Sequence, residues 1–250
     1  MFTHNLNPVL FSIGPLQIRW YGLVYIIGFL LVYYVLNKKR KELNLEKKDV
    51  ENFSLYIILA VVIGARLFEV LIWNPGYYFQ NPLKIFAVWE GGMAFHGGLL
   101  GVMLVVYYYV KKHKIPFLKL ADILTFPGLF ALALGRVANF INGELVGIVT
   151  NVKWCFNFPG YEGCRHPVQL YGAAGRFLLL GYLAAIKNIK KWKDGFIFWN
   201  FVLFMGIGRF FTDFLREDPR VLGLSMGQYL SAIMAIVAGV VLWKYYKRKA

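Results

Sequence analysis

The stretch RWYGLVYIIGFLLVYYVL, residues 19–36, decides the fold, and Arg19 is its only charged residue. The basic stretch KKRK, residues 38–41, follows it almost at once. A helix of about 20 mostly apolar residues is long enough to cross the hydrocarbon core of a bilayer. Basic residues collect at the cytoplasmic ends of such helices. The stretch therefore predicts a transmembrane helix that starts outside the cytoplasm and ends within it.

Apolar stretches of this kind recur along all 250 residues. Apolar residues make up 58% of the chain and charged residues 16%, against roughly a quarter charged in soluble domains. This composition excludes a soluble globule and a disordered chain, and the two cysteines exclude a disulfide-built scaffold. We expect an all-α polytopic integral membrane protein with about seven transmembrane helices, forming a single transmembrane domain over residues 1–250. The expected spans are 19–36, 51–73, 93–110, 120–138, 167–186, 196–215 and 228–243.

The net charge of +15 is unevenly distributed. Eighteen of the 28 Lys and Arg residues lie in the clusters Lys38–Lys48, Lys111–Lys119, Lys187–Lys193 and Lys244–Lys249. These clusters follow the first, third, fifth and seventh expected spans, so all four fall on one side. By the positive-inside rule the N-terminus is outside and the C-terminus cytoplasmic. The clusters contain no recognisable nucleic-acid-binding motif, which argues against nucleic acid as a partner and favours topology signals and anionic-lipid contacts.

Three segments are expected on the outer side, 74–92, 139–166 and 216–227. Residues 1–16 lack a basic region followed by a small-residue cleavage site, so no cleavable signal peptide is expected. Cys155 and Cys164 both lie in the second segment. A disulfide is permitted there, but the sequence leaves open whether it forms, and neither cysteine is expected to be catalytic.

Arginines occur within the expected spans or at their outer ends, and ionisable residues in such places are costly and usually functional. One alternative is that they form structural ion pairs, because Arg66 with Glu69 and Arg209 with Asp213 share helix faces. The other is that they bind a phospholipid headgroup, since the planar guanidinium fork suits phosphate. The five arginines, concentrated toward the outer half, are Arg19, Arg66, Arg136, Arg176 and Arg209.

The densest polar motif is GRVANFINGELVG, residues 135–147. If a helix persisted through it, Arg136, Asn139, Gly143 and Gly147 would share one face. Glycines would allow a lipid or a second backbone to approach closely. Helix packing and capping would explain the glycines and asparagines, but they would explain Arg136 and Glu144 poorly.

A second motif, GGMAFHGG at residues 91–98, flanks His96 with glycine pairs. A lone histidine is commonly a hydrogen-bonded structural residue. Its usual pKa of about 6.5 also suits a general base that takes a proton from a thiol, whose usual pKa is about 8.5. No second His stands at ligand spacing and no Cys-x-x-Cys occurs, so no metal site is expected.

Together these motifs resemble the prolipoprotein diacylglyceryl transferase family nearly from end to end. IRWYGL (residues 18–23), HPVQLY (166–171) and SMGQ (225–228) join the two longer motifs in this resemblance. Four positions depart from the usual family pattern. Val168 replaces Ser, Gly172 replaces Glu, Asp213 replaces a common Glu, and Arg19 stands before Trp-Tyr-Gly.

The resemblance implies transfer of the diacylglyceryl group of phosphatidylglycerol to the thiol of a lipobox cysteine in a prolipoprotein signal peptide. It implies the bacterial inner membrane as location, with the active site toward the outer leaflet, and no cofactor or metal. Its expected catalytic residues are His96, Arg136, Arg209 and Glu144. Its expected substrate-binding residues are Tyr21, Arg66, Gly97, Gly98, Asn139, Asn142 and Gly147.

Two other classes of protein compete with this interpretation. A lipid transporter or scramblase would also need arginines for headgroups, but spread through both leaflet halves. A phospholipid hydrolase or acyltransferase would need an activated serine. Ser225 has the Gly-x-Ser-x-Gly spacing in GLSMG, residues 223–227, but we identify no His-Asp pair that would activate it.

Overall fold

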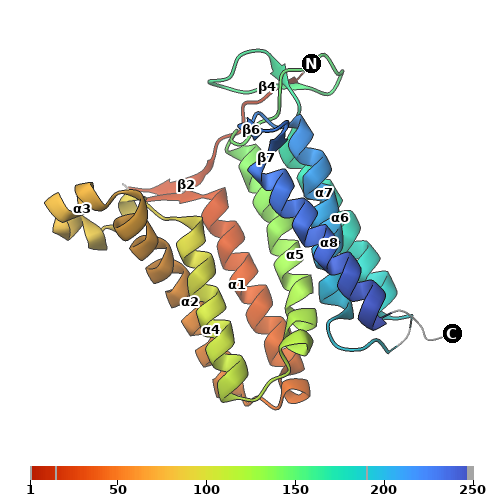
Figure 1. Ribbon diagram of the computed structural model, residues 1–250. Helices are drawn as coiled ribbons and strands as arrows, with labels where there is room; N and C mark the ends of the chain where they lie inside the picture. Colours follow the sequence, from red (N-terminus) through yellow and green to blue (C-terminus); the bar gives the residue numbers. More distant parts are fainter. Residues whose placement is uncertain (1, 15, 190, 247–250) are drawn as a thin grey trace. The chain divides into compact units, whose positions relative to one another are not determined.

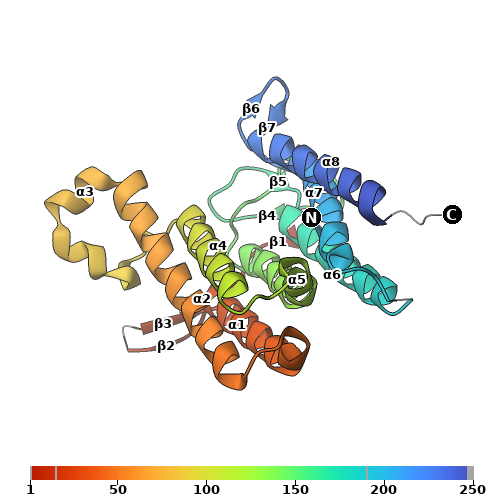
Figure 2. The same cartoon turned by 60° about the horizontal axis from the view of Figure 1, so that its bottom comes forward.

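The computed structural model describes residues 2–14, 16–189 and 191–246 (Figures 1 and 2). Each expected span coincides with a long helix, and six of the described helices are long and apolar enough to cross a membrane; α4 is the one outside that set. The expected helical membrane fold is confirmed, whereas the number of spans and the orientation of the termini stay predictions. The helices are α1 (Trp20–Lys39), α2 (Lys47–Phe68), α4 (Phe95–Lys112), α5 (Phe117–Ile141), α6 (Val168–Lys187), α7 (Phe196–Thr212) and α8 (Met226–Tyr246).

The chain divides into two compact units, and the expected single domain stays a prediction. The first unit contains the residues up to Leu31 together with those from Ala121 onward, and the second contains Val32–Leu120. Helix α1 begins in the first unit and ends in the second.

In the first unit, helices α5, α6 and α7 pack around an apolar core formed by Leu129, Leu179, Leu183 and Ile197. Helices α7 and α8 approach closely at Gly206, where an added Cβ would lie 2.7 Å from the carbonyl oxygen of Ser231. A glycine is needed there because any larger residue would separate the two backbones.

One end of the first unit is marked by a carboxylate that joins several elements. Asp122, near the start of α5, accepts hydrogen bonds of 2.7 Å from the amides of Gly195 and Phe198 at the start of α7. The Tyr246 hydroxyl at the end of α8 donates to the carbonyl of Asp194 over 2.6 Å. The described basic residues Lys187, Lys191, Lys193 and Lys244 therefore lie at this end, which we call the basic end. Of the same two basic clusters, Lys190, Lys247, Arg248 and Lys249 lie outside the described residues.

The opposite end of the first unit carries short strands that the sequence did not predict. Strand β1 (Phe2–Thr3) pairs in parallel with β4 (Phe156–Asn157), which pairs antiparallel with β5 (Cys164–Arg165). Strands this short carry no alternation of apolar and polar residues that could reveal them. Two antiparallel hairpins complete the set: β2 (Val9–Ile13) with β3 (Leu16–Arg19), and β6 (Arg220–Val221) with β7 (Leu224–Ser225).

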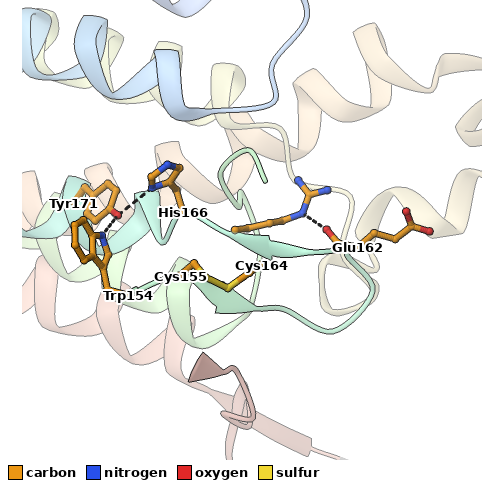
Figure 3. Close-up of a disulfide and its surroundings, with 7 residues drawn as sticks. Trp154, Cys155, Glu162, Cys164, His166 and Tyr171 are labelled. Atoms are coloured by element: carbon orange, nitrogen blue, oxygen red, sulfur yellow. Dashed lines mark hydrogen bonds between the residues drawn. A yellow bond between two sulfur atoms is a disulfide. The ribbon is translucent and has the colours of Figure 1, made fainter. Parts of the chain in front are cut away.

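A disulfide joins Cys155 to Cys164, whose Cα atoms are 5.5 Å apart (Figure 3). The sequence left open whether this disulfide forms, and the structure contains it. It closes the β4–β5 hairpin, and the residues that follow β5 lead directly into α6. The segment between α5 and α6 is therefore constrained by a covalent cross-link.

In the second unit, α2 and α4 are pressed together at glycines. An added Cβ on Gly97 would lie 2.1 Å from the carbonyl oxygen of Gly64, and one on Gly101 would lie 2.4 Å from that of Ala60. After α2 the chain continues through four short helical segments before α4. They are a π-helix η2 (Glu69–Trp73), α3 (Pro75–Gln80) and the 3-10 helices η3 (Pro82–Phe86) and η4 (Val88–Glu90).

Candidate functional site

The polar motif 135–147 forms the end of α5 and the turn after it. The helix ends at Ile141, so Gly143 and Gly147 do not continue its face as a longer helix would have placed them. Gly143 has φ +67°, a left-handed conformation that suits glycine and turns the chain. The turn folds Glu144 back onto the last turn of α5.

Hydrogen bonds hold Glu144 in place on three sides. The buried Asn139 donates from its side-chain amide to Oε1 of Glu144 over 2.8 Å, and the Glu144 amide donates to the Asn139 carbonyl over 3.1 Å. The Gln169 side chain, from α6, donates to the Glu144 carbonyl over 2.7 Å. Asn142 makes a longer contact of 3.4 Å to the same carboxylate, and its Oδ1 is buried with no hydrogen-bond partner in the described part of the chain. The carboxylate is thus pre-oriented.

Gly147 lies where three backbone segments meet. Its amide donates to the His166 carbonyl and its carbonyl accepts from Arg165, both over 3.1 Å. An added Cβ would lie 2.6 Å from the His166 carbonyl oxygen and 2.8 Å from that of Leu215. Only glycine permits this packing, which ties the end of α7 to the start of α6.

Two of the expected arginines, Arg136 and Arg209, lie near one buried carboxylate. Asp213, 2% exposed, lies 3.5 Å from Nε of Arg209 and 3.9 Å from Nε of Arg216. Arg136 is close enough to interact electrostatically with all three of these residues and with Tyr21. The expected Arg209–Asp213 pair is confirmed, but Arg136 makes no ion pair or hydrogen bond within the described residues.

Tyr21 lies in the first turn of α1. Its ring centroid is 5.3 Å from that of Tyr25, and Tyr25 lies within electrostatic range of Glu144. The first unit therefore brings together most of the expected site residues. These are Tyr21, Arg136, Asn139, Asn142, Glu144, Gly147 and Arg209.

A chain of polar side chains borders this site at the start of α6 (Figure 3). Trp154 Nε1 donates to the Tyr171 hydroxyl over 2.6 Å, and that hydroxyl lies 3.2 Å from Nδ1 of His166. An indole N–H can only donate, so the hydroxyl proton of Tyr171 is available to His166. Burial lowers the pKa of His166 below its usual value, because a charged imidazolium is poorly solvated there.

The remaining expected residues belong to the second unit. His96 is exposed near the start of α4, with its ring centroid 6.0 Å from that of Phe68 and 6.5 Å from that of Trp73. Gly97 and Gly98 are buried against α2. These contacts explain both glycines by helix packing, and their substrate-binding role stays a prediction.

Arg66 is enclosed by the segment that leads into α4. All five guanidinium N–H donors are used: Nε donates to the Ile85 carbonyl, Nη1 to those of Gly91 and Gly92, and Nη2 to those of Lys84 and Ala87. The expected Arg66–Glu69 pair is absent from the described ion pairs, because Glu69 instead accepts from Asn74 over 2.6 Å. Arg66 therefore anchors the segment, and its expected substrate-binding role stays a prediction.

Sequence reasoning missed how the start of α8 is fixed. The Ser225 amide donates to Oε1 of Gln228 over 2.9 Å, and the Gln228 amide donates to Oγ of Ser225 over 3.1 Å. This reciprocal capping is signalled by the spacing Ser-x-x-Gln. Gly227 between them is required, because an added Cβ would lie 2.3 Å from Oδ2 of Asp213. No group of three or more His, Cys, Asp or Glu residues suited to a metal ion occurs in the described residues.

Comparisons with known proteins agree over almost the whole chain. A family model described as prolipoprotein diacylglyceryl transferase matches residues 8–245. A protein of Geobacter sulfurreducens named phosphatidylglycerol--prolipoprotein diacylglyceryl transferase is 44% identical over 244 residues, which cover 94% of each chain. Relatives of the same name from Rickettsia africae and Rickettsia felis are 41% and 40% identical over 246 residues. These alignments cover 94% and 93% of this chain and 95% and 94% of the relatives.

We expect the Arg66→Lys variant to loosen the segment before α4. Lysine keeps the charge but not the planar fork, and each lost hydrogen bond removes a net stabilisation of about 1 kcal/mol. Trypsin cleavage after Lys84 should therefore accelerate roughly tenfold or more, since the cleavable open state becomes more populated. Arg19→Lys is the matched control, because Arg19 donates a hydrogen bond to the side chain of Gln17 and, within the described residues, anchors no segment through backbone carbonyls. Equal cleavage rates in Arg66→Lys and the wild type would contradict the anchoring role.

We expect His166 to make the protein less stable in mild acid. Its pKa is lower in the folded state than the value of about 6.5 in the unfolded chain. Protons therefore bind the unfolded state preferentially, and stability is lost as the pH falls below about 6.5. Melting temperatures at about pH 7.5 and pH 5.5 should differ less in His166→Gln than in the wild type. An unchanged difference would place the acid-sensitive group elsewhere.

Proposed function

The chain belongs to the prolipoprotein diacylglyceryl transferase family, and we propose that it transfers the diacylglyceryl group of phosphatidylglycerol to the lipobox cysteine thiol of prolipoproteins. This would be the first step of bacterial lipoprotein maturation. The observation that carries the proposal is the group of arginines around Asp213. Arg136 lies within a membrane helix without an ion pair in the described residues, which suits a site that receives an anionic lipid headgroup.

The reaction asks for a thiolate, because the thiolate is the nucleophile. The sulfur attacks the glyceryl carbon that carries the phosphate, so a carbon–sulfur bond forms and the carbon–oxygen bond to phosphate breaks. The bonding electrons leave with the oxygen, which releases glycerol phosphate. The thiol proton passes to a general base, for which we propose His96 by residue type.

Negative charge grows on the departing phosphate during this displacement. Arg136 and Arg209 would stabilise it, and they act most strongly where water is excluded. Arg209 forms an ion pair with Asp213, whereas Arg136 forms no ion pair within the described residues. We therefore assign Arg136 the larger share of this stabilisation.

The other polar residues of the site would orient the two substrates. Glu144 is held in a fixed position by Asn139 and offers a carboxylate to the glycerol hydroxyls of the headgroup or to the peptide. Tyr21 and Asn142 would supply further hydrogen bonds. Gly147 would keep the backbone close enough for a substrate to lie against it. Both acyl chains could remain in the bilayer meanwhile.

The location follows from the two ends of the first unit. The site lies where α5 and α7 end and where α6 and α8 begin, while the basic end lies at the other termini of the same helices. Since basic ends face the cytoplasm, we propose that the site faces the outer leaflet of the bacterial inner membrane.

We expect Arg136→Ala and Arg209→Ala to abolish transfer of labelled lipid to a lipobox peptide. Loss of one donor to a developing anion typically costs about 10²–10³ in kcat. The measurement is thioether formation by purified protein with phosphatidylglycerol vesicles. Lys193→Ala, which changes an exposed cation at the basic end, should keep full activity. Normal turnover in both arginine variants would refute their phosphate role, and free diacylglycerol as the product would identify a hydrolase instead.

We expect His96→Gln to lower kcat by about 10²–10⁴, the usual contribution of a general base. The loss should shrink as the pH rises toward the pKa of the substrate thiol, because the thiol then ionises without help. The measurement is the pH profile of kcat for both proteins. If His96→Gln retained most activity at every pH, His96 would be a positioning residue and another group would be the base.

A further inference from the structure

Arg176 is a membrane-embedded cation for which the proposed mechanism has no role. It lies eight residues after the start of α6, about 12 Å along the helix axis. Its Nη1 donates to the carbonyl of Gly172 over 2.7 Å. Its Nε is buried and has no hydrogen-bond partner in the part of the chain that the structure describes. A guanidinium held this way within a span is costly unless something pairs with it.

The side chains of Arg176 and Arg136 both lie next to Gly172. An added Cβ at this buried glycine would lie 2.9 Å from Nη1 of Arg176 and 3.5 Å from both Cγ and Cδ of Arg136. Two arginine side chains from different helices therefore meet over a position that has no side chain of its own. They repel one another, and Arg209 adds to the repulsion on Arg176.

Three acidic residues at this end of the first unit form ion pairs with other arginines. Asp213 pairs with Arg209 and Arg216, and Glu217 pairs with Arg165 over 2.6 Å. Asp218 pairs with Arg216 over 2.9 Å. Among the described residues, no carboxylate lies within ion-pair distance of Arg136 or Arg176. An external anion is the remaining way to offset two cations in a poorly solvated place.

We propose that Arg136 and Arg176, meeting over Gly172, form a subsite for a phosphate group, so that Arg176 is a third binding arginine beside Arg136 and Arg209. The identity of the lipid that would bind rests on the proposed function. The presence of the anion site does not depend on that function. Phosphate fits because its several oxygens can accept from two guanidinium groups at once.

The charge of the ligand should decide how much Arg176 contributes. The phosphodiester of the lipid carries one negative charge, whereas a released phosphate monoester carries about −1.5 to −2 at neutral pH. A surplus cation therefore favours the departing monoester over the intact lipid. Arg176 should matter most for glycerol phosphate, the product of the transfer.

Four proteins test the subsite: the wild type, Arg176→Gln, Gly172→Glu and Gly175→Gln. Gly172→Glu would place a carboxylate between the two arginines and replace the external anion. Gly175→Gln adds an uncharged side chain of nearly the same size on the same helix, at a glycine whose added Cβ would meet nothing within 4 Å, and it is the matched control. Thermal unfolding of each purified protein in detergent identifies any variant that has not folded, and Arg176→Lys replaces Arg176→Gln in that case.

The first measurement is titration calorimetry of glycerol phosphate, and separately of inorganic phosphate, into each folded protein. We expect Arg176→Gln and Gly172→Glu to bind roughly tenfold or more weakly than the wild type, as for loss of a charge-assisted hydrogen bond. Gly175→Gln should stay within about twofold to threefold of the wild type. Equal affinities in wild type, Arg176→Gln and Gly172→Glu would overturn the proposal for a free phosphate.

The second measurement is the KM for phosphatidylglycerol in nanodiscs with a lipobox peptide. If the lipid phosphate occupies the subsite, Arg176→Gln and Gly172→Glu should raise KM several-fold and Gly175→Gln should not. A change in this arm alone would identify the lipid as the source of the phosphate, and a change in the calorimetry alone would identify the released product. No change in either arm would refute the subsite. A wild type that binds glycerol phosphate but transfers no lipid would refute the proposed function and leave the subsite standing.

Discussion

Asp213 is the buried carboxylate on which the end of the first unit opposite the basic end depends. Arg209 approaches it from α7 and Arg216 from the segment after α7, while Ser225 and the backbone of Gly227 approach it from the start of α8. One carboxylate cannot neutralise every guanidinium nearby, because Arg136 and Arg176 also lie in this region. Removing a buried charge from such a pair is strongly destabilising. The same residue therefore holds two helices together and leaves a surplus of positive charge for an anionic ligand.

Close backbone contacts keep that surplus charge in a fixed place. Gly147 lets the segment after α5 touch both the carbonyl before α6 and the carbonyl after α7. The Cys155–Cys164 bond closes the hairpin that leads into this contact. Electrostatic stabilisation needs charges that do not reorganise during the reaction. Covalent closure and glycine packing supply this rigidity at the end of the first unit where the substrate would enter from the bilayer.

The sequence predicted the helices well because membrane spanning depends on length and apolarity, which are local properties. Asn139, Glu144 and Gly147 were also found as one motif, since they lie close along the chain. It could not predict contacts that depend on distant segments. Examples are the strand pairing of Phe2 with Phe156 and the hydrogen bonds from Arg66 to backbone carbonyls. Predicting them would require knowing which distant segments lie side by side. In the sequence, Gly172 indicated only the loss of a side chain relative to the usual family pattern. The structure adds that two arginine side chains lie beside this position.

Arg66 and Arg136 show why the residue type alone does not assign a role to a membrane arginine. Both are arginines within spans, and both were expected to contact the substrate. In Arg66 every N–H donor is used by a backbone carbonyl, so a phosphate could bind only by displacing part of the segment before α4. In Arg136 the described residues use none of the donors. An unpaired guanidinium within a membrane costs free energy that a bound anion recovers. The N–H donors of Arg136 that the described residues leave free therefore favour it as the binding residue, and the occupied donors of Arg66 favour it as the anchor.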